Sequence, residues 1–195
     1  VDHGPADGTA EGGVFSLLVD RGGIIWAAHL DGGITWSNGR LFRACTLGQG
    51  IKGPITGWLQ EKSGSILIST MGSGLWRILG EPDQSGALNA QRVGAESGMR
   101  DHLLTMAQLP DGRIALVTGS GGLQVMDGTS VTDFNISGVP DIFQRTSLFV
   151  DSKRRIWIGT EGGGAYRCDA NGQCDRFDIL NGLGGNTVYC FGEDG

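Results

Sequence analysis

The sequence lacks the long apolar runs, the basic excess and the helical periodicity that mark several common classes of protein. No stretch approaches the roughly 20 consecutive apolar residues of a membrane-spanning helix. The 21 Asp and Glu residues outnumber the 15 Lys and Arg residues, and the net charge of −6 argues against a nucleic-acid partner. Apolar residues do not recur at the 3.6-residue spacing of a helix. These absences indicate an acidic, all-β chain.

Motifs for catalysis and for metal binding are also absent. His3, His29 and His102 have no metal-ligating partner at short spacing, and neither HExxH nor Cys-x-x-Cys occurs. The serine of Gly119-Ser120-Gly121 has the letters of a nucleophile elbow but falls in a repeated glycine turn. The glycines at 162–164 join two strands instead of opening a helix, so they do not predict a phosphate loop. We therefore predict no metal, no cofactor and no catalysis by this segment.

Glycine is abundant, with 36 residues, and much of it recurs in register with a repeat. Four short apolar runs start 41, 48 and 42 residues apart, at Ile25, Ile66, Ile114 and Ile156. A glycine follows each isoleucine at the eighth position: Gly33, Gly74, Gly122 and Gly164. Glycine accepts the positive φ of tight turns, so these positions indicate turns between strands. Strand-like self-similarity at this period is typical of a β-propeller, in which each repeat is one blade.

The fourth copy predicts the blade most clearly. Its strands are expected over 145–150, 156–158, 165–168 and 174–177, with Asn171-Gly172 as a hairpin turn. We predict an all-β propeller of four-stranded antiparallel blades, with about four blades present at 14–53, 54–101, 102–144 and 145–187. Residues 188–195 are expected to begin a further blade, because they superpose on the start of the first copy. Four blades could close alone, pair with a second copy into eight, or be part of a seven-bladed ring, and we expect this chain to be a piece of such a longer propeller.

Two positions repeat in the first and fourth copies. Trp26 and Trp157 occupy the same place in the second strand, and we interpret them as core packing elements. Asp20 and Asp151 close the first strand, where we interpret them as caps of the hairpin turn and not as a catalytic acid and base.

The four cysteines have different expected roles. Cys168 and Cys174 flank the Asn171-Gly172 turn, so a hairpin would place them opposite each other, within the range that a disulfide tolerates. Both a disulfide and two reduced thiols fit this spacing. Cys45 and Cys190 are interpreted as small buried apolar residues.

Residues 148–164, with the phrase Ile-Trp-Ile-Gly-Thr followed by glycines, resemble the two-component regulator propeller repeat. Residues 14–34 match it through Asp20, Trp26 and Gly32-Gly33, but have Ala28-His29 where Gly-Thr is usual. Residues 178–183 and Asn186 resemble the link between blades of that family. The resemblance is weaker in the second copy and weakest in the third.

The resemblance implies a seven-bladed propeller outside the cytoplasmic membrane, preceding a membrane span and a histidine kinase or diguanylate cyclase domain. It implies a periplasmic sensor segment of an inner-membrane receptor, which is a homodimer in its full form. The implied ligand is a small molecule, such as a glycan fragment. The implied protein partners are neighbouring propeller blades.

Candidate binding residues lie in the loops that a propeller places on one rim. These loops join the second strand to the third, and the fourth strand to the next blade. Residues that depart from the repeat there are polar and of mixed charge, suited to a sugar or a peptide. They are His29, Asp31, Met71, Arg100, His102, Ser120, Arg145, Glu161 and Asn186.

Two other functions compete with ligand sensing. A propeller that binds protein or dimerises would expose a large apolar patch. A propeller lyase or glycosidase would need an acid and a base that converge on the rim, for which His29, His102 and Glu161 are the candidates.

Overall fold

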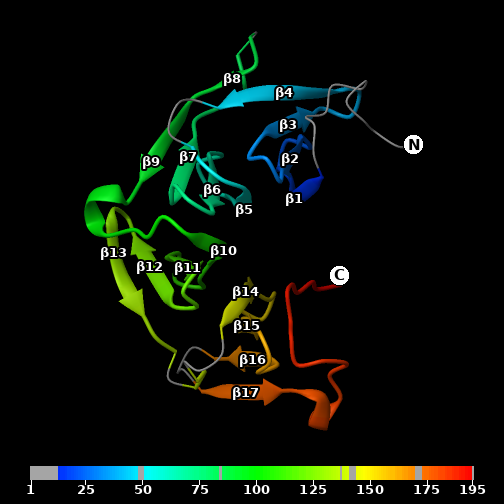
Figure 1. The fold of residues 1–195 in the computed structure, drawn as a ribbon, viewed down its shortest axis with the longest axis vertical. Coiled ribbons are helices and arrows are strands. Elements are labelled where there is room, and N and C mark those ends of the chain that lie inside the picture. Colours follow the sequence, from blue (N-terminus) through cyan, green and yellow to red (C-terminus); the bar gives the residue numbers. More distant parts are fainter. Residues whose placement is uncertain are drawn as a thin grey trace. The chain divides into compact units, whose positions relative to one another are not determined.

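A computed structural model describes residues 13–47, 51–83, 85–136, 138–140, 144–169 and 173–194. The chain divides into two compact units, one with residues 1–95 and 100–103 and the other with residues 96–99 and 104–195. The described residues form strands in four sheets and two short 3-10 helices, η2 (Ala95–Ser97) and η3 (Ile179–Asn181) (Figure 1). No helix among them is long and apolar enough to span a membrane.

The first unit contains two blades, each with its strands in antiparallel order. The first blade consists of β1 (Val14–Val19), β2 (Ile25–His29), β3 (Ile34–Ser37) and β4 (Phe42–Leu47). The second blade consists of β5 (Ile55–Gln60), β6 (Ile66–Thr70), β7 (Leu75–Ile78) and β9 (Ala90–Val93). The glycine turns between these strands have the positive φ that the repeat predicts, for example 76° at Gly74.

One strand of the first unit lies outside the predicted four-stranded plan. The extension that lengthens the second repeat carries β8 (Ala87–Leu88), which pairs in parallel with β4 of the first blade. Leu88 is buried in the core of this unit. The turn before β8 is closed by Asp83, whose carboxylate accepts hydrogen bonds from the backbone of Ser85 and Ala87. The first sheet therefore has five strands, and the extension ties the second blade to the first.

The third and fourth blades follow the four-stranded plan. The third consists of β10 (Leu103–Gln108), β11 (Ile114–Thr118), β12 (Leu123–Asp127) and β13 (Ser130–Phe134). The fourth consists of β14 (Arg145–Val150), β15 (Ile156–Thr160), β16 (Ala165–Cys168) and β17 (Cys174–Phe177). These four sheets confirm the predicted fold class.

The second strand of each blade lies at the centre of the packing. Every residue of β6 and of β11 is buried. One apolar cluster joins the two blades of the first unit, and a second joins the third and fourth blades.

The repeated aspartate and tryptophan form a hydrogen-bonded pair. Asp20 accepts hydrogen bonds from the backbone of Gly22 and Ile24 at 2.8 and 2.9 Å, and from the indole Nε1 of Trp26 at 3.0 Å. The same carboxylate therefore caps the turn and orients the tryptophan. This confirms the predicted capping role of Asp20. The hydrogen bond from the indole of Trp26 was not predicted from the sequence.

Asp151 repeats this arrangement in the fourth blade. It accepts hydrogen bonds from the backbone and guanidinium of Arg155 and from the indole of Trp157, at 2.9, 2.6 and 2.9 Å. Burial opposes ionisation of this carboxyl, but the hydrogen bonds from Trp157 and Arg155, with the positive charge of Arg155, outweigh burial and lower its pKa to about 2.

The other two blades replace both members of the pair together. In the second blade Glu61 takes the acidic position, Leu67 replaces the tryptophan, and Glu61 forms a two-point ion pair with Arg77 on β7 at 2.6 and 2.8 Å. In the third blade the two positions hold Leu109 and Ala115, both buried. An acidic residue therefore occupies this position only in the blades that supply a side-chain hydrogen-bond donor for it.

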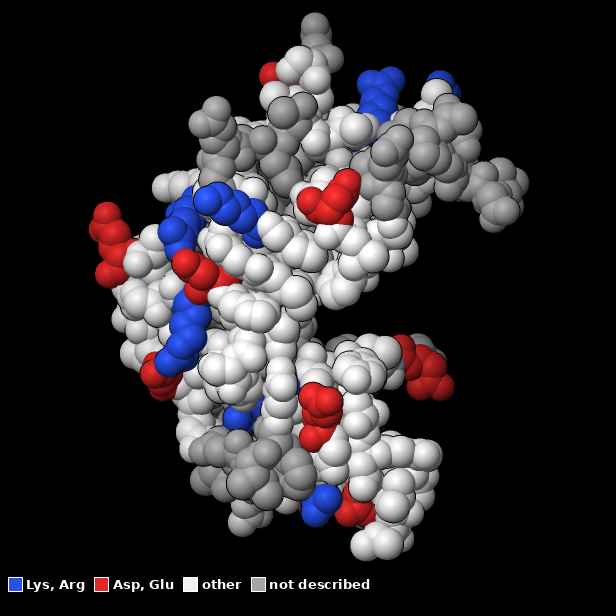
Figure 2. Space-filling model, viewed as in Figure 1, with Lys and Arg blue, Asp and Glu red and all other residues white. Residues whose placement is uncertain are grey.

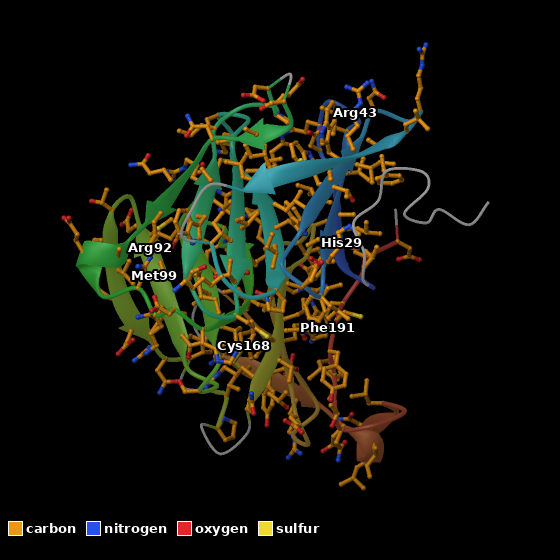
Figure 3. The ribbon with its side chains drawn as sticks, turned by 45° about the horizontal axis from the view of Figure 1, so that its top comes forward. His29, Arg43, Arg92, Met99, Cys168 and Phe191 are labelled. Carbon is orange, nitrogen blue, oxygen red and sulfur yellow. A yellow bond between two sulfur atoms is a disulfide. The ribbon has the colours of Figure 1, made fainter. Side chains whose placement is uncertain are left out.

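Cys168 and Cys174 are opposite each other in the ladder between β16 and β17, and their sulfur atoms form a disulfide (Figure 3). The predicted Asn171-Gly172 turn between them lies outside the described residues. Cys45 is half-buried, and burial raises the pKa of its thiol to about 12. Cys190 is exposed, so the interpretation of that residue as buried was wrong.

Candidate functional site

A threonine closes the turn between the second and third strands in three of the four blades. The hydroxyls of Thr70, Thr118 and Thr160 donate to the carbonyl of the glycine four residues later, at 2.9, 3.2 and 2.8 Å. Each of these threonines is fully buried. The rim turns are therefore held by a repeated structural residue, and variation is left to the tips of the turns.

His29 occupies this threonine position in the first blade. Its side chain is 1% exposed, and its Nε2 lies 2.9 Å from the hydroxyl of Thr35 (Figure 3). Its backbone makes the same closing bond as the threonines, from the amide to the carbonyl of Gly33 at 2.9 Å. The structure thus places His29 inside the blade and not on the surface of the rim.

The rim loops of the first unit form a row in which each loop contacts the next. A side chain at Gly32 would lie 3.0 Å from the carbonyl of Gly53, and one at Gly53 would lie 2.7 Å from the carbonyl of Met71. Met71 in turn pairs with His102 through an isolated β-bridge. These approaches are too close for most side chains, which explains the glycines at the contact points.

Three of the predicted residues come together in this row. Met71 and His102 are bridged, and Arg100 precedes Asp101, whose carbonyl accepts hydrogen bonds from Gly72 at 3.0 Å and Gly74 at 2.8 Å. The side chains of Met71, Arg100 and His102 are all exposed. Asp31 is exposed at the other end of the row, and its carboxylate caps its own turn at the amide of Gly33, 3.0 Å away.

The remaining predicted residues belong to the second unit. Ser120 and Glu161 are exposed, and the turns that carry them both contact Gln144. Arg145 is 3% exposed, and its Nη1 donates to the carbonyl of Gly121 at 2.8 Å. The side-chain oxygen of Asn186 accepts from the amide of Ile179 at 3.0 Å. Arg145 and Asn186 therefore position the loops, whereas Ser120 and Glu161 face solvent.

Three cavities lie at the opposite ends of the blades, near the hairpins between first and second strands and between third and fourth strands. One of about 290 Å³ is lined by residues that include Asp20, Trp26 and Gln60. One of about 230 Å³ beside Trp157 is lined by residues that include Phe191 and Glu193. The third, of about 600 Å³, is lined by Gly138, Arg155, Arg167, Asp169, Gln173, Cys174 and Asp175.

The charged groups of the surface are mixed. On the face drawn in Figure 2 basic side chains lie beside acidic ones. Among the ion pairs of the chain are Arg77–Glu61 and Arg92–Asp101. Within the described ranges, no group of three or more His, Cys, Asp or Glu residues is arranged to hold a metal ion. The exposed part of the rim therefore offers hydrogen-bond donors and acceptors together with the thioether of Met71.

Comparison with known proteins identifies the fold. No family model and no curated protein matches the chain. Among solved structures, it is similar to the extracellular domain of a proposed one-component system of B. thetaiotaomicron, with a TM-score of 0.67 and 16% identity over 84% of this chain and 24% of that one. Such identities establish a shared propeller fold and nothing finer.

Two further solved structures with other functions are also similar to this chain. PorZ, a surface component of the type-IX secretion system of Porphyromonas gingivalis, matches with a TM-score of 0.68 and 13% identity over 91% of this chain and 29% of that one. Virginiamycin B lyase from Staphylococcus aureus matches with a TM-score of 0.64 and 14% identity over 84% and 55%. The chain thus spans between about a quarter and about half of the three structures. The neighbours include a domain of a signalling system, a secretion component and an enzyme.

Proposed function

We propose that this chain is a ligand-sensing propeller segment of an extracytoplasmic receptor, of the two-component regulator propeller repeat family. The observation that carries the proposal is the convergence of Met71, Arg100 and His102 on the rim of the first unit. All three side chains are exposed, and the residue at the position of Met71 differs in each blade. The extracellular signalling domain among the structural neighbours supports the same function.

The proposed ligand is a small polar molecule such as a glycan fragment. Arg100 supplies donors, His102 supplies a donor and an acceptor, and Met71 supplies an apolar contact. In the full receptor we propose a periplasmic location, a membrane anchor, a kinase or cyclase output domain and a homodimer, as the resemblance of the repeats implies. We propose that the segment itself performs no catalysis, because His29, one of the candidate acid and base residues, is buried against Thr35.

Titration calorimetry with a panel of oligosaccharides tests the proposal. We expect one class of sugar to bind, and we expect Arg100→Ala and His102→Ala to weaken its binding at least tenfold. Lys62→Ala is the matched control, because Lys62 is exposed on the hairpin between β5 and β6, at the other end of the strands. An equal loss in the control, or binding that is insensitive to both rim variants, would contradict the proposed site.

A second function, binding of another protein, is favoured by a different observation. Val14, Leu17 and Val19 on β1 are large apolar residues that are 54%, 62% and 65% exposed. Exposed apolar side chains in a row are typical of an interaction surface.

A further inference from the structure

The cavity of about 290 Å³ in the first unit has walls from both the first and the second blade. Its walls combine a carboxylate with apolar side chains: Asp20, Ile24 and Trp26 from the first blade, and Ile66 and Ile78 from the second. The volume is at the lower end of the roughly 300–1,000 Å³ of ligand pockets, so the cavity suits a small molecule.

The extension of the second repeat contributes to the same cavity. Gly80 and Glu81, at its start, are among the lining residues. Further along the extension, β8 pairs with β4 of the first blade. The segment that departs from the repeat therefore lines the cavity and also ties together the two blades that form it.

The aspartate of the cavity has an equivalent residue in the fourth blade. Strands β1 and β14 have the same bulge and the same ladder register, and Asp20 and Asp151 directly follow them. Each aspartate accepts hydrogen bonds from the amide four residues later and from the indole of the tryptophan six residues later. The two Asp–Trp pairs therefore present the same groups in the same arrangement.

The fourth blade supplies a cation to its Asp–Trp pair. Arg155 is four residues after Asp151, and its Nε donates to the carboxylate at 2.6 Å. The guanidinium carbon also lies 5.8 Å from the centre of the Trp157 ring, in a cation–π contact. The Asp–Trp pair of this blade thus binds one guanidinium group.

The first blade has an isoleucine where the fourth has this cation. Ile24 occupies the position of Arg155, four residues after Asp20, and its side chain lines the cavity. Among the described residues, no lysine or arginine forms an ion pair with Asp20 or lines the cavity. Arg21 follows Asp20, but its guanidinium donates to the side chain of Gln60 in the second blade at 3.0 Å. The carboxylate and the indole that hold a guanidinium in the fourth blade therefore line a cavity in the first.

We propose that this cavity binds a small organic cation, a guanidinium or ammonium group on a short apolar stem. The cation takes the place beside Asp20 that Arg155 takes beside Asp151. The ring of Trp26 lies next to the cation, and the stem packs on the isoleucines of the walls. Glu81, which is exposed, adds a second negative charge to the lining and attracts cations. This site lies at the opposite ends of the strands from the rim and goes beyond the proposed function.

An NMR titration with propylguanidinium, which reproduces the side chain of arginine, tests the proposal. Propylurea, a neutral molecule of the same shape, is the matched control ligand. We expect propylguanidinium to shift the indole N–H resonance of Trp26 at the millimolar concentrations typical of so small a ligand. We expect propylurea to bind at least tenfold more weakly. Equal binding of the two molecules, or no shift with propylguanidinium, would overturn the proposal.

Ile24→Arg tests the comparison with the fourth blade. This variant places a guanidinium where the fourth blade has Arg155, so its own side chain should occupy the cavity and weaken the binding of propylguanidinium at least tenfold. Thr132→Arg is the matched control, because it adds the same charge at an exposed position of β13, in the other unit. Unchanged binding by Ile24→Arg, or an equal loss in the control, would overturn the site.

Asp20→Asn tests the charge of the carboxylate. The variant keeps one oxygen that accepts hydrogen bonds but removes the negative charge, and we expect binding of propylguanidinium to weaken at least tenfold. Circular dichroism confirms that the variant retains its β-sheet content. Full binding by the folded variant would contradict the role of Asp20. Ile24→Arg leaves the Asp20 side chain in place, so the proposal stays testable if Asp20→Asn fails to fold.

A blocked Gly-Arg-Gly peptide distinguishes a free small cation from the arginine side chain of another protein. We expect the peptide to bind no more tightly than propylguanidinium, because the cavity accommodates the cation and its stem alone. Binding of the peptide at least tenfold more tightly would assign the site to a protein side chain and overturn the assignment to a small molecule.

Discussion

The first and fourth blades share an Asp–Trp pair, a bulge in the first strand and the same ladder register, yet equivalent residues have different surroundings. Leu17 is 62% exposed and Leu148 is 8% exposed, whereas Trp26 is 1% exposed and Trp157 is half-buried. Each blade is thus well covered on the face where the other is open. The difference teaches that the repeat determines the blade, while burial depends on the neighbouring blade.

The two blades also differ in how closely the next segment approaches. A side chain at Gly159 would lie 2.2 Å from the hydroxyl of Ser147 and 2.3 Å from the carbonyl of Val188. The first blade has Ala28 at this position, and its methyl group is fully buried without conflict. Gly159 therefore lets the carbonyl of Val188 lie closer to the fourth blade than a methyl group at this position would allow.

The largest expected difference is between the two tryptophans. Trp26→Ala should lower the free energy of unfolding by about 3–5 kcal/mol, because it empties a covered site in the core. Trp157→Ala should cost less, because part of that ring already contacts solvent. Urea denaturation of both variants measures the difference, and equal losses would show that the two blades are covered alike.

The next largest difference between the two blades is expected from adding a methyl group at Gly159, where the following segment lies closest. Gly159→Ala should cost about 1–3 kcal/mol through overpacking and should release residues 188–194. Ala28→Gly, the reciprocal change, should cost about 1 kcal/mol and leave that segment in place. Limited proteolysis reports the release directly. Unaltered cleavage after residue 187 in Gly159→Ala would argue against the observed contact.

Only the fourth blade contains a disulfide across its outer hairpin. Replacing Cys168 and Cys174 with alanine should lower the free energy of unfolding by about 2 kcal/mol, as expected for closure of so short a loop. Without reductant the unfolded chain should contain two reactive thiols, those of Cys45 and Cys190. Four reactive thiols in a titration would contradict the disulfide.

The smallest expected effect is the loss of stability of the fourth blade at acidic pH. The lowered pKa of Asp151, about 2, means that its carboxylate favours the folded state. This contribution is complete above about pH 4, the ordinary range of an unfolded aspartate, and is lost as the pH falls toward 2. Asp151→Asn should make stability less dependent on pH across this window. Denaturation series at several pH values test this, and an unchanged acid dependence would assign it to other groups.

Most strands could be predicted because glycine and polar turns punctuate apolar runs at a fixed spacing. The limits predicted for β16 and β17 match the structure, and those for β15 fall two residues short at the C-terminal end. The two-residue strand β8 was missed because its parallel pairing with β4 is non-local and leaves no periodic signal. Its only trace was the longer interval between the second and third copies.

The site was harder to predict because a residue can differ from the repeat for two physical reasons. It can lie exposed on the rim, or it can replace a buried structural residue. Met71 and His102 depart from it and are exposed, whereas His29 departs from it and is buried in the threonine position. Aligning His29 with Thr70, Thr118 and Thr160 would have indicated that it occupies a buried structural position. The Asp–Trp contact also left a signal, since both members are present in two copies and absent together from the third.

Hydroxyl-radical footprinting with mass spectrometry tests most directly the claim that equivalent blades differ only in what covers them. In dilute solution Leu17 should be oxidised many times faster than Leu148, although both hold the same position in the ladder. Equal oxidation of Leu17 and Leu148 in dilute solution would contradict the account.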